Sequence, residues 1–347
     1  MNWNEYGAFI IEETKNLLAI DSPSGMTKKA AEHVAARFEA LGYAPQTTRK
    51  DGVLVCLGGR DRENGLLLEA HMDTLGGMVC QIKANGRLKI TPIGGLRAEN
   101  VETENCRVVT KFDGVIEGTA QLINASTHVN EKYADTQRTF DTVEIVLDEP
   151  VADAEDVKKL GVRTGDYVCF EPRTRVTQSG YIKSRFLDDK LSVGILLGYA
   201  KYLKDEQITP ERAVYVHITS FEEVGHGGSA SVPAGVTEAI SVDMGCVGEG
   251  LTCDERMVSI CAKDSGGPYH YDVVRGLIAA AEKMGAPYAV DVYPRYGSDV
   301  EATLRAGYDI RHGLIGSGVY ASHGYERSHV KGVENTLRLI EKYVEKA

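Results

Sequence analysis

The chain has 347 residues, of which 43% are hydrophobic and 26% charged, and its formal net charge at pH 7 is -11. That length exceeds one ordinary hydrophobic core and predicts two domains. The acidic balance and the lack of a basic run argue against nucleic acid as a partner, because its binding needs Lys and Arg to neutralise phosphates. The sequence shows neither a membrane-spanning apolar stretch nor a signal peptide, so we expect a cytoplasmic protein with no membrane partner.

Two helices are predicted before the first strands. Apolar residues recur at helical spacing over residues 4–20, a Pro- and Gly-containing break follows at residues 21–25, and a second helix is predicted over residues 27–41. Short apolar runs at residues 53–57 and 66–70 then indicate strands that are buried on both faces.

The character of the sequence changes after Asp73. Over residues 76–176, short strand-like pieces alternate with Gly, Asn and Asp turns, and only one weak helix is predicted, at residues 154–160. Alternation of helices and strands returns only after this segment. We therefore expect a small β-rich domain, 76–176, inserted into an α/β domain made of residues 1–75 and 177–347.

The rest of the chain predicts a doubly wound α/β fold, in which a mixed sheet is flanked by helices. Its predicted strands and helices alternate in the order expected for such a fold. The strands are 214–221, 239–242 and 314–320, and the helices are 191–202, 272–284 and 333–343.

Several apolar runs end on residue types that bind metals. In an open α/β sheet, ligands bind beyond the carboxyl ends of the strands, so side chains far apart in the sequence can meet there. The seven cysteines include no C-x-x-C pair, so a thiolate site is not indicated. The candidates are His71 and Asp73 after 66–70, Glu222 and Glu223 after 214–221, Asp243 after 239–242, and His323 after 314–320.

Each candidate has an ordinary structural explanation when it is taken alone. Asp188 and Asp189 precede a predicted helix and suit an N-cap as well as a ligand. The two neighbouring glutamates suit a solvated turn, or else one binds metal while the other takes a proton from water. Asp73, two residues after His71 on a strand, would lie on the same side and steady the imidazole. The joint order of these residues favours a metal site, with His323 preferred over His329 as the last ligand.

These residues resemble, in order and spacing, the M42 family of cocatalytic metallo-aminopeptidases, and the likeness extends over nearly the whole chain. The segments that carry it are His71-Met72-Asp73, Leu187-Asp188-Asp189-Lys190, Glu222-Glu223-Val224-Gly225, Val242-Asp243-Met244-Gly245, His323, Ile93-Gly94-Gly95, residues 159–166 and Tyr296-Gly297-Ser298-Asp299.

The resemblance implies two divalent metal ions per subunit, with zinc as the first expectation and cobalt or manganese as alternatives. Asp188 would bridge the two ions. His71 and Asp243 would complete the coordination of one ion, and Glu223 and His323 would complete that of the other. The resemblance also implies that Glu222 is the general base. Asp73, beside His71, is the second candidate catalytic residue.

The leading hypothesis is a metallo-aminopeptidase that removes N-terminal residues from short peptides. The resemblance implies that the inserted domain, PDZ-like or barrel-like, supports a homo-oligomer, often a dodecamer. One alternative is a two-metal amidase or deacylase acting on N-acyl amino acids. A glycosidase would need Glu222 and Glu223 about 5–9.5 Å apart around a sugar, a poor match for neighbouring residues. A metal-binding protein without catalysis is the remaining alternative.

Overall fold

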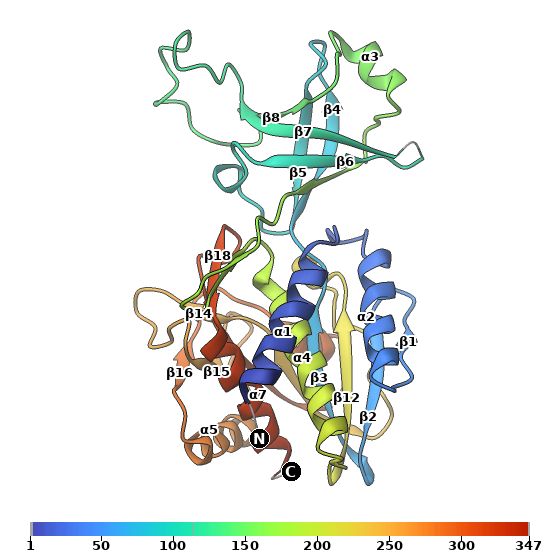
Figure 1. Cartoon of the computed structure of the whole chain (residues 1–347), viewed down its shortest axis with the longest axis vertical. Coiled ribbons are helices and arrows are strands. Elements are labelled where there is room, and N and C mark those ends of the chain that lie inside the picture. Colours follow the sequence, from blue (N-terminus) through green and yellow to red (C-terminus); the bar gives the residue numbers. More distant parts are fainter. Residues whose placement is uncertain (1–2, 113, 346–347) are drawn as a thin grey trace. The chain divides into compact units, whose positions relative to one another are not determined.

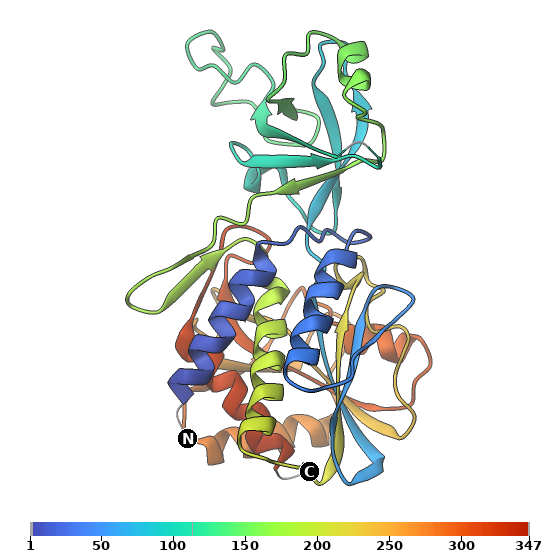
Figure 2. The ribbon, with the colours of Figure 1, turned by 45° about the vertical axis from the view of Figure 1, so that its right-hand side comes forward.

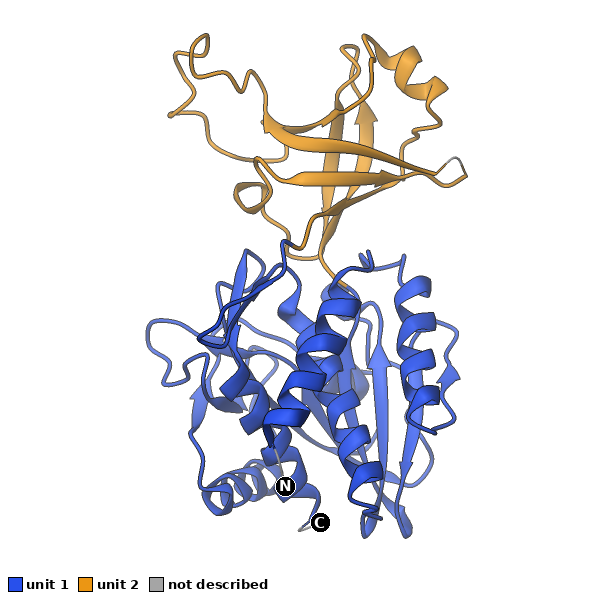
Figure 3. Ribbon diagram, in the orientation of Figure 1, with its two compact units in different colours: residues 1–73, 173–347 blue, residues 74–172 orange. Residues whose placement is uncertain are grey.

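The computed structural model describes residues 3–112 and 114–345, which fold into two compact units (Figure 3). The first unit comprises residues 1–73 and 173–347, and the second comprises residues 74–172. The chain therefore leaves the first unit directly after Asp73 and returns to it at Arg173.

A mixed sheet, 12-stranded within the described residues, forms the centre of the first unit. Its middle consists of four parallel neighbours, β12 (Arg212–Thr219), β3 (Asp61–His71), β13 (Val236–Val242) and β17 (Arg311–Tyr320). The outer strands are β1 (Gln46–Thr47), β2 (Val53–Gly58), β10 (Arg175–Val176), β11 (Tyr181–Ser184), β14 (Gly245–Val247), β15 (Val258–Lys263), β16 (Tyr288–Val292) and β18 (Glu326–His329).

Helices cover both faces of this sheet. On one face α1 (Trp3–Leu18), α4 (Leu187–Asp205) and α2 (Lys28–Ala40) lie side by side (Figures 1 and 2). Two more helices, α5 (Tyr271–Met284) and α7 (Val330–Val344), contribute to the same core, whereas α6 (Asp299–Arg305) packs on the opposite face.

The side-chain alternation of β3 produces these two cores. Leu66 and Leu68 point into the larger core with α1 and α4, and Leu67 points into the smaller core beside α6. Both faces of the strand are buried, which explains its continuous apolar run. Lys190, fully buried in α4, donates through Nζ to the carbonyls of Leu17 and Ile20 at 3.0 and 2.7 Å, and so ties α4 to the end of α1.

The four parallel strands end at the same edge of the sheet. Thr219 at the end of β12 is in register with His71 at the end of β3, and β13 and β17 end nearby at Val242 and Tyr320. Side chains that follow these strands therefore meet at one edge.

The second unit is a closed barrel with strand order β4-β5-β8-β7-β6-β9. Closure pairs the edge strands, which would otherwise expose unpaired backbone groups. Buried apolar side chains from alternate strand positions, such as Val79, Ile90 and Ile145, fill its interior. The strands are β4 (Gly76–Ile82), β5 (Leu88–Ile93), β6 (Asn105–Val109), β7 (Val115–Leu122), β8 (Val143–Leu147) and β9 (Tyr167–Phe170), and the unit also contains α3 (Ala154–Lys159) and a 3₁₀ turn at Ala98–Asn100.

This architecture confirms the expected fold class, a mixed α/β sheet flanked by helices together with a small β-rich unit. Two details differ from the expected elements. The strand expected over 214–221 ends at Thr219, because Phe221 has a φ of 67°, a left-handed conformation that a strand does not accommodate. The hairpin formed by β10 and β11 belongs to the first unit, although part of it was expected in the insertion. Within the described residues, every helix is too short or too polar to cross a membrane.

Candidate metal centre

The first unit brings the predicted site residues to the carboxyl edge of the parallel strands. Each lies at a strand end, at the start of a helix or in a turn. His71 ends β3, Asp73 follows it, Asp188 lies in the first turn of α4, Glu222 and Glu223 form the 3₁₀ turn η2 (Glu222–Val224) after β12, Asp243 follows β13, and His323 lies in the turn between β17 and β18.

Asp188 lies between the two histidines. Its Oδ1 is 3.1 Å from Nε2 of His71, and its Oδ2 is 3.5 Å from Nε2 of His323. Oε2 of Glu223 is also 3.5 Å from Nε2 of His323. The two oxygens of one carboxylate therefore face two different imidazoles, which is the arrangement required of a bridging ligand.

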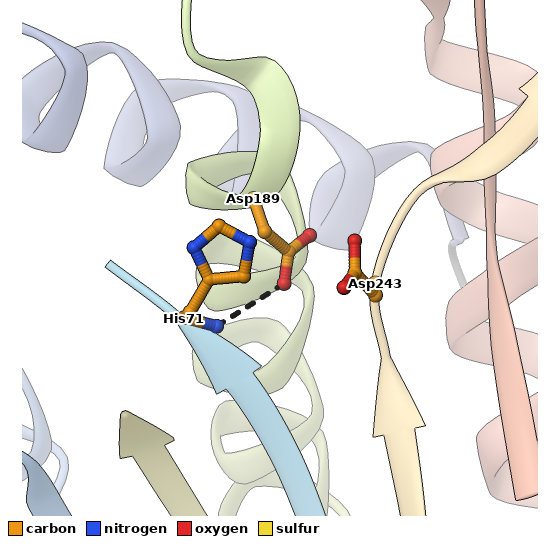
Figure 4. Close-up of side chains that lie close together, drawn as sticks. All are labelled: His71, Asp189 and Asp243. Carbon is orange, nitrogen blue, oxygen red and sulfur yellow. Dashed lines mark hydrogen bonds between the residues drawn. The ribbon is translucent and has the colours of Figure 1, made fainter. Parts of the chain in front are cut away.

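Asp189 joins the cluster, although the expected ligand set did not include it. Figure 4 shows its carboxylate between His71 and Asp243, with Oδ2 accepting the backbone N–H of His71 at 3.2 Å. Ligand atoms of His71, Asp189 and Asp243 lie within 4.8 Å of one another, as do those of His71, Asp188 and Glu223. Its position next to Asp188 in a pair of aspartates was the only signal in the sequence.

The cluster holds more negative than positive groups. Burial raises the pKa of Asp243 to about 7 and raises the pKa of three other carboxyls well above their usual range. Burial acts in the same direction on Asp188, but hydrogen bonds from His323 and His71 outweigh it and lower its pKa. The carboxyl groups are those of Asp188, Asp189, Glu222, Glu223 and Asp243, and the only histidines in contact with them among the described residues are His71 and His323.

A buried excess of carboxylates is costly unless a cation balances it. Oδ1 of Asp189 is buried and makes no hydrogen bond within the described residues, so it is free to face such a cation. Carboxylate oxygens and imidazole nitrogens are donors that suit zinc, cobalt and manganese. The residues present therefore fit a divalent metal centre.

Asp73 makes contacts that differ from the expected one. Nδ1 of His71 lies 2.9 Å from the backbone carbonyl of Asp73, whereas the Asp73 carboxylate is 3.6 Å away. The carboxylate instead accepts the backbone N–H groups of Glu222 and Glu223, at 3.1 and 3.3 Å, and the hydroxyl of Ser24 at 2.5 Å. The carbonyl orients the imidazole so that Nε2 faces the cluster, and the carboxylate holds the turn that carries the two glutamates.

Left-handed backbone conformations mark three of the segments that form the cluster. Phe186, Phe221 and His323 have φ values of 66°, 67° and 62°. For residues other than glycine, this conformation costs about 1–2 kcal/mol each and persists only where surrounding contacts hold it. Such residues concentrate at functional sites, which is consistent with their positions around this cluster.

His329 does not lie in the cluster. Its Nδ1 accepts the backbone N–H of Lys331 at 2.9 Å at the start of α7, and its Nε2 is 2.8 Å from the carbonyl of Ser179. Both ring nitrogens therefore have partners elsewhere. The structure places His323, rather than His329, beside Asp188.

Two residues that contact the predicted site residues were not anticipated from the sequence. Ser24 lies in the break between α1 and α2, 49 positions before Asp73. Glu326 accepts the backbone N–H groups of both Asp188 and His323. Neither residue type is unusual in its local sequence, so only the fold reveals these contacts.

Comparisons with known proteins agree with this geometry. Residues 51–339 match the family model described as M42 glutamyl aminopeptidase. The chain is 41% identical over 335 residues to "Putative aminopeptidase YhfE" of Bacillus subtilis, covering 96% of this chain and 97% of that protein.

Two solved structures share the fold. An aminopeptidase from the archaeon Desulfurococcus kamchatkensis is 22% identical, with a TM-score of 0.87 over 99% of this chain and 96% of that one. The TET1 peptidase of Pyrococcus horikoshii is 23% identical, with a TM-score of 0.85 over 97% of this chain and 100% of that one. The match to the family model, together with the B. subtilis relative, confirms the resemblance noted in the sequence: the chain belongs to the M42 family of aminopeptidases.

Proposed function

We propose that the chain is a two-metal aminopeptidase that removes N-terminal residues from short peptides. The observation that carries this proposal is the position of Asp188, whose two oxygens face His71 and His323. The proposed ligand set is Asp188 as the bridge, His71 and Asp243 for one ion, and Glu223 and His323 for the other. Zinc is the first expectation, and cobalt or manganese also suits these donors.

When bound, the two cations supply Lewis-acid activation of the scissile carbonyl and of an attacking water. Glu222 would act as the general base. Its Oε2 lies 3.6 Å from Nε2 of His71, and its side chain is 15% exposed, so it borders the ligands while keeping access to solvent. A carboxylate in this position accepts the proton of the attacking water and delivers it to the leaving amine.

The charge of the site favours a free N-terminus as the substrate. Two divalent cations carry four positive charges against the five carboxylates of the cluster. The remaining negative charge attracts the protonated amine of an unblocked peptide, and it gives no comparable attraction to a neutral acylated N-terminus. The same site could hydrolyse N-acyl amino acids, and the experiment below distinguishes the two activities.

The test compares aminoacyl p-nitroanilides with the matching N-acetyl-aminoacyl compounds, each with and without a chelator. We expect kcat/KM to be at least about 100-fold higher for the free amines, since a desolvated charge contact of about 3 kcal/mol is lost on acetylation. A chelator should suppress the turnover of both. If only the acetylated compounds are turned over, the aminopeptidase proposal is wrong and the activity is that of a deacylase.

We also propose that the chain forms a homo-oligomer through the barrel unit. The P. horikoshii TET1 peptidase is described as assembling into a tetrahedron or a large octahedral shell, and the shared fold supports a similar assembly. Twelve copies of the 37.8 kDa chain would have a mass of about 450 kDa. Light scattering on a gel-filtration column measures this mass directly, and a monomer at micromolar concentration would contradict the proposal.

A further inference from the structure

Glu326 connects two ligand-bearing segments that are far apart in the sequence. The residue begins β18, and its side chain is buried, with 2% of its surface exposed. Its Oε2 accepts the backbone N–H of Asp188 at 3.0 Å, and its Oε1 accepts the backbone N–H of His323 at 2.9 Å. Each carboxylate oxygen therefore accepts one backbone N–H donor.

Strand pairing places Glu326 between the two segments. β18 is antiparallel to β11, with Glu326 opposite Ser184, and the chain proceeds from Ser184 to Asp188 at the start of α4. On its other side, β18 follows the turn that carries His323. Alternation along the strand buries Glu326 and Ser328, while Arg327 points outward to an ion pair with Glu255.

Both N–H groups lie where regular secondary structure offers no acceptor. Asp188 has φ -75° and ψ 103°, which is not helical although it lies in the first turn of α4, and the first N–H groups of a helix have no partner within the helix. His323 has a φ of 62° in a tight turn. A buried N–H group without an acceptor is destabilising. Glu326 supplies the acceptor for the buried N–H of Asp188 and for the partly buried N–H of His323, and so stabilises both local conformations.

We infer that Glu326 is a positioning residue that holds the Asp188 carboxylate and the His323 imidazole in place relative to each other. This inference rests on the proposed function, because it takes Asp188, Glu223 and His323 as the ligands of one ion. The Nε2 atom of His323 lies 3.5 Å from both Oδ2 of Asp188 and Oε2 of Glu223. Glu326 fixes the backbone of two of these three residues through its hydrogen bonds to their N–H groups.

The substitution Glu326→Gln tests this role with little change in volume. Glutamine offers one acceptor oxygen and one NH₂ group, so one backbone N–H would face a donor in place of an acceptor. We expect the affinity for the ion held by Glu223 and His323 to fall by about 10- to 100-fold, the usual effect of removing an outer partner of a metal ligand. The effect on the ion held by His71 and Asp243 should be smaller.

A matched control is available in α1. Glu13 is also buried, and both of its carboxylate oxygens accept bonds from Arg37, at 2.6 and 2.7 Å. Glu13→Gln therefore removes a comparable buried carboxylate that contacts none of the metal-site residues. It should leave the affinity for both ions unchanged even if it lowers the melting temperature.

The experiment titrates full-length metal-free protein with Zn²⁺ alone in a calorimeter and with Co²⁺ alone by visible absorption. We expect wild type and Glu13→Gln to bind two ions per chain, and Glu326→Gln to show one weakened site with an altered Co²⁺ spectrum. Turnover of Glu326→Gln should recover as the metal concentration is raised, which a general folding defect would not allow.

Two wild-type sites together with unchanged affinities and spectrum in Glu326→Gln would overturn the inference and leave the proposed function intact. Binding of only one ion by wild type would overturn both. If Glu326→Gln does not fold, Glu326→Asp takes its place, since it keeps both oxygens but withdraws them by one methylene. An affinity loss in that variant supports the inference, and wild-type affinity overturns it.

Discussion

Glu222→Gln is expected to reduce kcat by about 100- to 10,000-fold while both metal ions stay bound. The amide cannot accept a proton, but it keeps the size of the side chain and the backbone N–H bond to Asp73. The proposed ligands, including Glu223 next to it, are unchanged. Steady-state turnover of an aminoacyl p-nitroanilide together with metal analysis of the same sample measures both expectations.

The neighbouring residue provides the matched control for this substitution. Glu223→Gln removes a carboxylate whose Oε2 lies 3.5 Å from Nε2 of His323, so it should lower metal content and activity together. If Glu222→Gln keeps more than about a tenth of wild-type kcat, the proposed proton transfer belongs to another group. If it loses metal as Glu223→Gln does, Glu222 is a ligand and not the base.

Removal of the metal is expected to abolish turnover and to lower the melting temperature by about 5 °C or more. Without cations, the buried carboxylates of the cluster repel one another, with only His71 and His323 as counter-charges among the described residues in contact with them. Differential scanning fluorimetry of chelated and zinc-reloaded protein measures the shift. An unchanged melting temperature after verified metal removal would contradict a metal centre at these residues.

The metal-free protein should also lose stability as the pH rises. Burial and the nearby carboxylate of Asp188 raise the pKa of Asp243 from an ordinary 3.8 to about 7. Between about pH 4 and pH 7 the folded state therefore binds more protons than the unfolded state, so unfolding becomes easier as pH increases through this window. The melting temperature of chelated protein should fall from pH 5 to pH 7, whereas bound zinc should offset this fall. A rise in the melting temperature of the chelated protein from pH 5 to pH 7 would exclude this explanation.

The sequence was sufficient to locate those site residues that follow apolar strands. His71, Asp243 and His323 each follow a run of buried apolar residues, and parallel strands present their carboxyl ends at a common edge. The pattern therefore carries spatial information even though the residues are up to 252 positions apart. Their roles as ligands stay a prediction until metal binding is measured.

Hydrogen bonds between residues far apart in the chain could not be predicted from the sequence in the same way. Ser24 reaches Asp73 over 49 positions, and Glu326 reaches Asp188 over 138. These contacts depend on strand register and on turns with left-handed residues such as Phe186. Neither produces an apolar period or a spacing that a single sequence could reveal.

Insertions and deletions are expected to have different effects on the two sides of the junction after Asp73. Asp73 is the last residue of the first unit before the insertion, and Thr74 begins the second unit. A gain or loss of residues in the barrel loops would leave the hydrogen bonds from the Glu222 and Glu223 amides to Asp73 in place. One residue removed between His71 and Asp73 would break them, because it would move the Asp73 carboxylate away from the Glu222 and Glu223 amides. Changes of length in the barrel loops are therefore expected to leave these hydrogen bonds intact, whereas the spacing from His71 to Asp73 decides whether they form.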